Sequence, residues 1–251
     1  MGIVYHQAAL RSVPKSVGNP LEYHEVNATG TLRLLQLARE GGVRRVIYAS
    51  SSSVYGDDTP LPQAEDLRPK PQSPYAASKL AAEIYAALFT QTYGLETVGL
   101  RYFNVFGPRQ SLENQYAVVI PKFITSLLKG GPPPIHGDGM QTRDFTYVEN
   151  VVQANLRAAA APKKVMGEVF NVASGCRHSV RELARLLNGI LGLSVRPKLL
   201  ARRPGDVLHT WADIRKAKHL LGYRVNVSFE EGLRQTAEWF RQHPEDWNIV
   251  S

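Results

Sequence analysis

The sequence predicts an α/β fold, namely a partial, doubly wound parallel sheet with a smaller C-terminal α/β lobe. Short β-branched runs alternate with longer helical patterns, which is typical of βαβ units. The length of 251 residues provides for one large domain or two small ones. The 43% of hydrophobic and 21% of charged residues are ordinary for a globular chain and exclude a disordered or fibrous protein.

The first part of the chain is expected to contain three strands and two helices. The second helix has the clearest boundaries, because Ser73 is a good N-cap, Pro74 suits the first helical position and Gly94 ends the helix. In order, the predicted elements are a strand over residues 3–9, a helix over 21–40, a strand over 45–49, a helix over 75–93 and a strand over 96–103.

From about Tyr116 onward the strand and helix alternation loosens, which indicates a second lobe. The predicted elements there are helices over 118–129, 149–160, 180–191 and 228–241, a strand over 168–173 and a short strand within 131–139. A doubly wound dinucleotide-binding core starts with a strand and a glycine-rich turn, and this sequence contains no such turn. We therefore interpret residues 1–115 as an incomplete core from its fourth strand onward. Residues 116–251 are interpreted mainly as a substrate-binding lobe, with some segments returning to the core.

The formal net charge of +8 is concentrated in one segment. Between Arg177 and Arg224 there are eleven basic and three acidic residues, so this stretch alone has the net charge of the whole chain. A basic stretch can bind nucleic acid or an acidic small molecule, and it is often only a solvated surface. Because basic and aromatic residues do not alternate along it and no zinc-finger or helix-turn-helix signature is present, we predict no nucleic-acid partner. A nucleic-acid or protein-binding module built on this segment is the alternative from a different class.

The sequence contains no feature of a membrane-bound or secreted protein. No run of 18 or more apolar residues occurs, and the N-terminus lacks the basic and apolar regions of a signal peptide. Cys176 is the single cysteine, so an internal disulfide is excluded and a cytoplasmic location is expected. No metal site is predicted.

Three residues are predicted to meet at a reaction site. Tyr75 and Lys79 are separated by four residues, which places them on one helix face about 6 Å apart along the axis. Ser51 follows a predicted strand, and the carboxyl ends of parallel strands surround the ligand crevice of such folds. A tyrosine four residues before a lysine is usually structural, and a run of serines is usually a polar turn. In combination these residues favour a site.

Seven ordered motifs give the sequence a specific resemblance. They are His6-Gln7-Ala8-Ala9, Asn27 with Gly30-Thr31, Ser50-Ser51-Ser52-Ser53-Val54-Tyr55-Gly56, Tyr75-x-x-x-Lys79, Arg101-Tyr102-Phe103-Asn104-Val105-Phe106-Gly107, Thr142-Arg143-Asp144-Phe145 and Arg203-Pro204-Gly205-Asp206. The chain resembles the extended short-chain dehydrogenase/reductases, in their sugar-nucleotide epimerase/dehydratase branch. The resemblance implies a Rossmann-like fold, NAD as cofactor, a UDP-sugar as substrate and a homodimer that forms through the helices over 21–40 and 75–93.

The resemblance also implies a role for each matched residue. Tyr75 would be the general base that takes a proton from a sugar hydroxyl, Ser51 its hydrogen-bonding partner and Lys79 the group that holds the nicotinamide ribose and lowers the tyrosine pKa. The cofactor-binding set is Ala8, Ala9, Arg11, Tyr75, Lys79 and Phe103. The substrate-binding set is Ser12, Ser52, Ser53, Asn104, Gln110, Arg143, Arg203, Asp206 and Thr210.

The pKa of the catalytic phenol sets a requirement on this site. Lowering it from about 10 to about 7 requires roughly 4 kcal/mol. An ammonium about 6 Å away supplies only about 2.8 kcal/mol at an effective dielectric constant near 20. We therefore expect Tyr75 to become an effective base only with the oxidised, positively charged cofactor bound.

The residues around the predicted base favour 4-epimerisation, which proceeds by transient oxidation at C4. Dehydratases of this branch have Asp-Glu after the catalytic hydroxyl, where this chain has Ser52 and Ser53, and an unassisted serine is too weak an acid to expel water. Glucose-specific epimerases have a bulky tyrosine at the position of Thr210, so UDP-N-acetylglucosamine and UDP-N-acetylgalactosamine are the favoured substrates. Arg11 departs from the acetylated-sugar enzymes, which usually have glycine there. A UDP-glucose 4-epimerase or other family member, and a non-catalytic UDP-sugar-binding protein, are the alternatives.

The first strands of the core, which bear the glycine-rich turn of the family, have no counterpart in this sequence. We therefore expect a fragment with little or no epimerase activity on its own, in which the strand over residues 3–9 forms an unpaired sheet edge.

Overall fold

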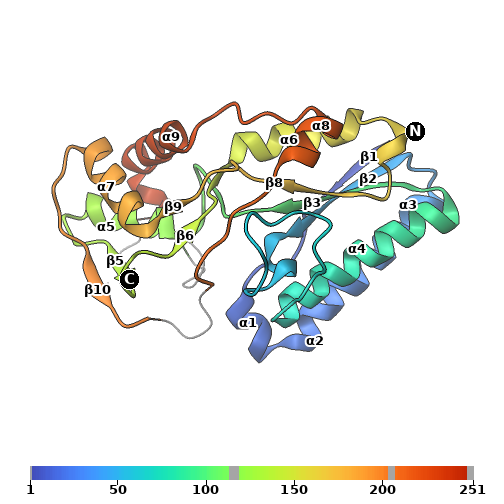
Figure 1. Cartoon of the computed structure of the whole chain (residues 1–251), viewed down its shortest axis with the longest axis horizontal. Helices are drawn as coiled ribbons and strands as arrows, with labels where there is room; N and C mark the ends of the chain where they lie inside the picture. The colour runs from blue at the N-terminus through green and yellow to red at the C-terminus, as the bar shows by residue number, and fades with distance from the viewer. Residues whose placement is uncertain (1, 113–118, 203–206, 248–251) are drawn as a thin grey trace.

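The computed structural model describes residues 2–112, 119–202 and 207–247 and has a parallel sheet at its centre (Figure 1). Four strands lie in the order β1-β2-β3-β8, and every neighbouring pair is parallel. These strands are β1 (Ile3–His6), β2 (Arg45–Ser51), β3 (Glu96–Tyr102) and β8 (Val169–Val172). The predicted parallel sheet is therefore confirmed, and within the described residues β1 forms one of its edges.

Helices cover both faces of this sheet, as a doubly wound fold requires (Figure 1). On one face lie α3 (Gly30–Glu40) and α4 (Pro74–Tyr93), and on the other lie α6 (Val148–Ala160) and α8 (Arg215–Leu221). Consecutive side chains of a strand point to opposite faces, so both must be apolar. Val46 packs in the cluster beneath α3 and α4, and Ile47 packs in the cluster on the other face.

A smaller lobe, at the left of Figure 1, packs around its own apolar cluster, which includes Phe123, Leu183 and Leu233. Its helices are α5 (Val119–Leu128), α7 (Val180–Leu191) and α9 (Phe229–Gln242). Three two-stranded sheets accompany them: β4 (Val105–Phe106) with β7 (Thr146–Tyr147), β5 (Pro134–His136) with β10 (Lys198–Leu200), and β6 (Thr142–Arg143) with β9 (His178–Ser179). The predicted boundary after residue 115 lies outside the described residues and stays a prediction. In the described part of the chain, no helix combines the length and apolarity needed to cross a membrane.

The structure corrects several predicted boundaries. The first strand ends at His6 instead of Ala9, and the single helix expected over 21–40 is divided into α2 (Pro20–Tyr23), a π-helical turn η1 (His24–Thr29) and α3. Two short helices were not predicted, α1 (Val13–Gly18) and α8. Short 3₁₀ turns also occur at η2 (Ser52–Tyr55), η3 (Lys163–Val165) and η4 (Pro244–Asp246).

Candidate active site

Ser51, Tyr75 and Lys79 meet at the carboxyl end of β2. Ser51 is the last residue of this strand, and its hydroxyl forms a hydrogen bond with the Tyr75 phenol. One helical turn further along α4, the Lys79 ammonium donates a hydrogen bond of 2.8 Å to the carbonyl of Ala49, which lies two residues before Ser51. The structure thus brings the three residues together at the strand end. Their individual roles stay predictions.

Ser53 reinforces the position of the Ser51 hydroxyl. The Ser51 Oγ accepts hydrogen bonds from the Ser53 backbone N–H at 3.2 Å and from the Ser53 hydroxyl at 3.0 Å. These contacts begin the 3₁₀ turn η2, in which Ser52 is the first residue and half-buried. Three of the four serines therefore lie at the place where the sheet ends and the ligand crevice of such folds begins.

Burial raises the pKa of Tyr75 above its ordinary value of 10.0. The hydrogen bond from Ser51 and the positive charge of Arg11 counter this rise, and Tyr23 adds to it. The lowering of the Tyr75 pKa by Lys79 stays a prediction. The Arg11 guanidinium, from the loop after β1, supplies a nearby positive charge.

Lys79 is a buried cation whose binding capacity is only partly used. Its side chain is 6% exposed, and burial lowers its pKa from 10.5 to about 8, with the Glu83 carboxylate acting against this shift. An ammonium has three donor hydrogens, and among the described residues only the Ala49 carbonyl accepts one. The same ammonium, together with burial, lowers the pKa of His6 at the end of β1, whose Nε2 lies 2.9 Å from the Thr31 hydroxyl.

The π-helical turn η1 connects the loop after β1 to the start of α4. Asn27 lies in this turn, and its side-chain amide both accepts from the Leu10 backbone N–H at 2.8 Å and donates to the Leu10 carbonyl at 2.9 Å. The same amide donates to the Ser78 hydroxyl at 3.1 Å. Residues of such turns are often functional, because the extra residue redirects a side chain. Here Asn27 fixes the loop over 8–12 against the helix that carries Tyr75.

A second group of predicted residues meets in the smaller lobe. The Asn104 amide donates to the Thr210 hydroxyl at 3.0 Å, and the Asp144 backbone N–H donates to the same oxygen at 3.3 Å. Asn104 has φ +31°, which is uncommon for any residue except glycine and is found at functional sites. The Arg143 guanidinium, on β6, donates to the Leu208 carbonyl at 3.1 Å, two residues before Thr210.

The other predicted residues have different surroundings. Ala8 is exposed, and Ala9 is half-buried in the loop after β1, where Arg11 is exposed. Ser12 is the N-cap of α1, and its N–H donates to the Tyr23 hydroxyl at 3.1 Å. Gln110 donates to the Val105 carbonyl at 3.0 Å, and the Phe103 side chain is completely buried in the core. Arg203 and Asp206 lie outside the described residues.

The comparison with known proteins decides the family. Residues 1–173 match the NAD dependent epimerase/dehydratase family. The chain belongs to this family. The proteins of the family are NAD-dependent, and its members with known structures share the Rossmann-like arrangement described above.

Individual members of the epimerase/dehydratase family act on different UDP-sugars. The UDP-glucose 4-epimerase of Mycolicibacterium smegmatis is 38% identical over 95% of this chain and 76% of its own length. The UDP-glucuronate 4-epimerase of Thermodesulfobacterium geofontis is 37% identical over 96% of this chain and 73% of its own. The structure of a UDP-N-acetylglucosamine 4-epimerase from Methanobrevibacter ruminantium superimposes with a TM-score of 0.92, at 41% identity over 96% of this chain and 77% of that one.

The residues at the end of β2 fit the NAD cofactor of the family. The Lys79 ammonium is buried and retains donor hydrogens for ligand hydroxyls, as a residue that holds a ribose must. Ala8 and Ala9 have small side chains at the end of β1, so a ligand can approach the backbone closely there.

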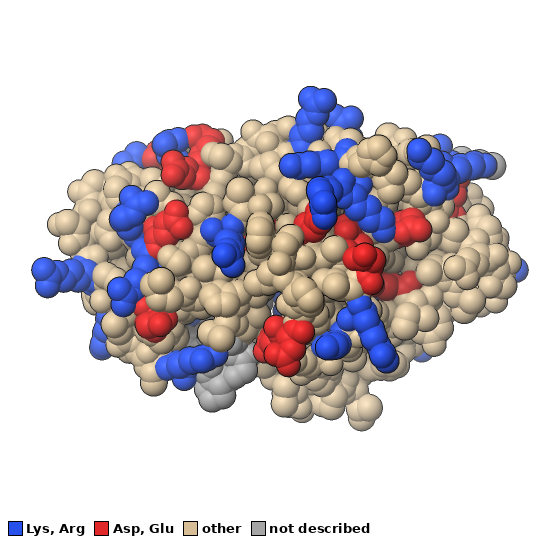
Figure 2. Space-filling view, in the orientation of Figure 1, with Lys and Arg blue, Asp and Glu red and all other residues tan. Residues whose placement is uncertain are grey.

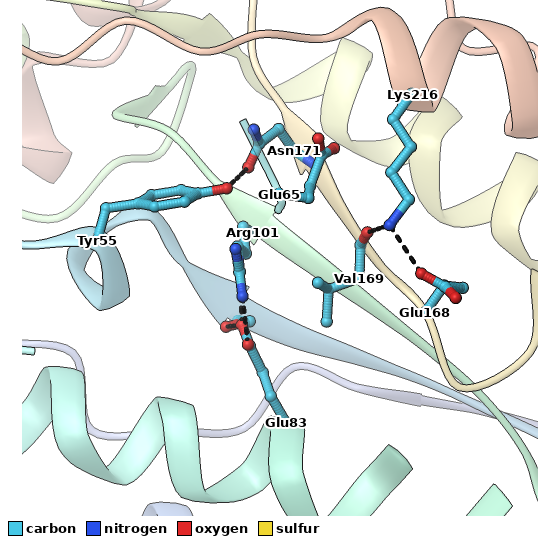
Figure 3. A network of polar contacts seen from close by, with 9 residues as sticks. Tyr55, Glu65, Glu83, Arg101, Glu168, Val169, Asn171 and Lys216 are labelled. Carbon is cyan, nitrogen blue, oxygen red and sulfur yellow. Dashed lines mark hydrogen bonds and ion pairs between the residues drawn. The ribbon is translucent and has the colours of Figure 1, made fainter. Parts of the chain in front are cut away.

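Sequence reasoning missed a buried polar network that fixes α4 in this epimerase-family fold (Figure 3). Arg101 on β3 donates two hydrogen bonds to Glu83 on α4, at 2.9 and 2.7 Å, and the Ser50 hydroxyl donates to the same carboxylate. The Arg101 guanidinium lies over the Tyr55 ring, 4.8 Å from its centre, and the Tyr55 hydroxyl donates to Asn171 at 2.7 Å. Glu83 lies four residues after Lys79, so the sequence could have indicated that both residues share one face of α4.

A spectroscopic titration tests the description of the Tyr75 environment. The difference between the phenolate absorbance of the unaltered chain and of Tyr75→Phe should report a Tyr75 pKa above 10.0 for the chain alone, because burial dominates. Saturating NAD⁺, whose ring is positively charged, should lower this pKa, whereas NADH should not. Equal Tyr75 pKa values with the two forms would contradict the expectation.

Proposed function

We propose that this protein is an NAD-dependent UDP-hexose 4-epimerase that interconverts UDP-N-acetylglucosamine and UDP-N-acetylgalactosamine. The observation that carries the proposal is the contact between the Tyr75 phenol and the Ser51 hydroxyl beside a buried Lys79 ammonium at the end of β2. Tyr75 accepts the proton of the sugar 4-hydroxyl and, after the 4-keto sugar has rotated, returns it to the same oxygen, while Ser51 donates a hydrogen bond to this oxygen. Lys79 would bind ribose hydroxyls of NAD⁺, which would take the C4 hydride from one face of the sugar and give it back to the other.

The chemistry of the neighbouring residues limits the reaction to epimerisation. A dehydratase needs an acid that protonates the departing hydroxyl. The positions after Ser51 hold Ser52 and Ser53, and the Ser53 hydroxyl is already directed at Ser51, 3.0 Å away. A serine hydroxyl without an adjacent acid or base is too weak for that step. A 4-epimerase needs no such group.

Conversion of the sugar tests this proposal. With NAD⁺ present, chromatography should detect only slow formation of UDP-N-acetylgalactosamine from UDP-N-acetylglucosamine, because this sequence has no counterpart of the glycine-rich turn of the family and little activity is expected. Tyr75→Phe should leave the dissociation constant of the UDP-sugar within about twofold, while conversion decreases by about a thousandfold, in the range that one acid–base residue provides. Calorimetry that detects UDP-sugar binding without any conversion would favour the non-catalytic binding protein, and absence of binding would overturn the proposal.

Thr210 supports the choice of an acetylated sugar. Its hydroxyl accepts hydrogen bonds from the Asn104 amide and from the Asp144 backbone N–H. Because threonine is much smaller than the tyrosine of the glucose-specific enzymes, we infer space for a C2 acetamido group beside it. Thr210→Tyr should therefore weaken binding of UDP-N-acetylglucosamine by at least about tenfold, because the larger side chain would fill this space, and spare UDP-glucose. Calorimetry with both sugars measures this, with Thr210→Ser as the matched control. An equal loss for both sugars would count against Thr210 as the residue that selects acetylated sugars.

We also propose a homodimer formed through the outer face of α2, α3 and α4. Leu21, Leu37 and Ile84 on these helices are 84%, 67% and 61% exposed, and an apolar face of this kind marks an interaction surface. Light scattering should give twice the chain mass of 27.9 kDa, and Ile84→Glu should give the monomer. The control Leu199→Glu, on β10 in the smaller lobe and 54% exposed, should remain dimeric. A monomeric unaltered chain would contradict the proposal.

A further inference from the structure

A pocket on the face of the sheet opposite α3 and α4 is not used by the proposed reaction. Its volume is about 560 Å³, and it lies between α6, α8 and the segment that follows α8. Three cations line it: Arg157 from α6, Lys218 from α8 and Arg224 from the following segment. Among the described residues, none that lines it is acidic. We refer to this site as the basic pocket.

The cations beside the basic pocket form ion pairs with carboxylates, and those that line the pocket differ in this respect. On α8, Arg215 is paired with Asp213 at 2.6 Å and Lys216 with Glu168 at 2.8 Å. Asp213 is the carboxylate near Lys218, but both of its oxygens already accept hydrogen bonds from Arg215. No ion pair of the pocket cations occurs within the described ranges.

The surface around the basic pocket accounts for part of the charge excess in the sequence. Lys218 and Arg224 belong to the segment over 177–224, which alone has a net charge of +8, and Arg157 reaches the same place from another helix. Figure 2 shows Lys and Arg side chains gathered over the area that Figure 1 identifies as α6 and α8. Like charges held together without counter-charges repel each other, so an anionic ligand is the occupant that this arrangement favours.

The chemistry of the three cations identifies the class of ligand. Each guanidinium can bind two oxygens of one phosphate, and an ammonium adds a point charge. The volume lies within the range of about 300–1,000 Å³ that small-molecule sites occupy. The cations surround one cavity and do not form a stripe along the surface. We propose that the basic pocket binds a small molecule through a phosphate or diphosphate group.

The basic pocket is separate from the substrate side of the candidate active site. Ser174 lines the pocket, and its hydroxyl donates to Asp144 at 2.6 Å. Asp144 has no exposed surface, and on its other side it accepts from the Ala212 N–H at 3.2 Å, two residues after Thr210. A buried carboxylate therefore lies between the pocket and the segment that bears Thr210. This inference concerns anion binding only and does not rest on the proposed function.

Calorimetric titration with inorganic pyrophosphate tests the proposal in the full chain. Saturating UDP-N-acetylglucosamine is included to occupy the substrate site. Arg157→Ala and Arg224→Ala should each weaken pyrophosphate binding by about tenfold, the effect of one charged hydrogen bond. The control Arg44→Ala removes the same charge from an exposed position before β2, outside the pocket, and should change the dissociation constant by less than about twofold.

The following results would overturn the proposal. An equal loss in all three variants would show attraction by net charge alone. Displacement of pyrophosphate by the UDP-sugar, with no effect of Arg157→Ala and Arg224→Ala, would place it in the substrate site. Absence of pyrophosphate binding would also overturn it. Duplex DNA that binds at physiological salt and loses affinity in the same two variants would identify the surface as a nucleic-acid site instead.

Discussion

Replacing Arg101 by methionine is expected to lower the free energy of unfolding by about 3–5 kcal/mol. Arg101 and Glu83 form a paired, two-bond contact at 2.9 and 2.7 Å, and their side chains are only 4% and 6% exposed. Without the guanidinium, the Glu83 carboxylate keeps the Ser50 hydroxyl as its side-chain donor among the described residues, and remains inside the protein without its ion-pair partner. Breaking a buried pair therefore costs far more than the pair itself contributes.

Urea unfolding followed by tryptophan fluorescence measures this loss. Arg241→Met is the matched control, because it removes the same group from a pair with Glu238 whose side chains are 64% and 42% exposed. That change should cost less than about 1 kcal/mol. The double variant Glu83→Met with Arg101→Met should recover most of the loss, since two apolar groups replace the pair. A loss below 1 kcal/mol for Arg101→Met alone would contradict our account of the network.

The same pair has a consequence for the candidate site. Glu83 lies one turn after Lys79, and its negative charge raises the pKa of that ammonium against the effect of burial. The pair also fixes α4 to β3, so it determines where Tyr75 and Lys79 lie relative to the end of β2. The network in Figure 3 thus connects the stability of the fold to the position of its reactive groups.

Elements with local signals could be predicted from the sequence. α4 was expected from residue 75 and begins at Pro74, because the Ser73 hydroxyl accepts from the Ala76 N–H at 3.1 Å and caps the helix. It ends at Gly94, whose φ of +69° is a conformation that glycine adopts without strain. Signals of the same kind were overlooked at α1, where Ser12 is the N-cap and Pro14 follows it.

Features that depend on distant contacts could not be predicted in this way. The π-helical turn η1 inserts an extra residue into a helical pattern, and Asn27 stabilises it through Leu10 and Ser78, 17 and 51 residues away. Similarly, Arg45 reads as an exposed charge in the sequence. Only the register of β2 against β3 places it opposite Glu96, where it is buried and donates to that carboxylate at 2.8 Å.

The sequence predicted which residues meet at the candidate site. It did not indicate that the charge of Arg11 would act on Tyr75. The spacing of Tyr75 and Lys79 and the strand-end position of Ser51 are properties of local sequence, and the structure places these residues together. The charge that acts on Tyr75 comes from Arg11, whose loop approaches α4 only through the tertiary fold. An axial spacing of about 6 Å gave no information on which cation the phenol would face.

Replacing Lys79 by methionine should make the protein more stable at pH 7 and impair its cofactor binding. Burial lowers the Lys79 pKa from 10.5 to about 8, so the native state holds the charged form at a cost of about 3 kcal/mol at neutral pH. Methionine fills similar space without a charge, although the hydrogen bond to Ala49 is lost. We expect a net gain of about 1–2 kcal/mol, together with an NAD⁺ dissociation constant raised at least about tenfold.

The pH dependence distinguishes this explanation from a simple packing effect. Between pH 8 and 10.5 the unfolded chain keeps the Lys79 proton while the native protein releases it, so the stability contributed by this site rises with pH across that window. The advantage of Lys79→Met should therefore shrink by about 2 kcal/mol between pH 7 and pH 9.5 in urea unfolding. Lys164→Met, which changes an exposed lysine, should show no such trend. An advantage that is the same at both pH values would mean that the buried charge is not its cause, and that Lys79 is held in the site without an energetic cost.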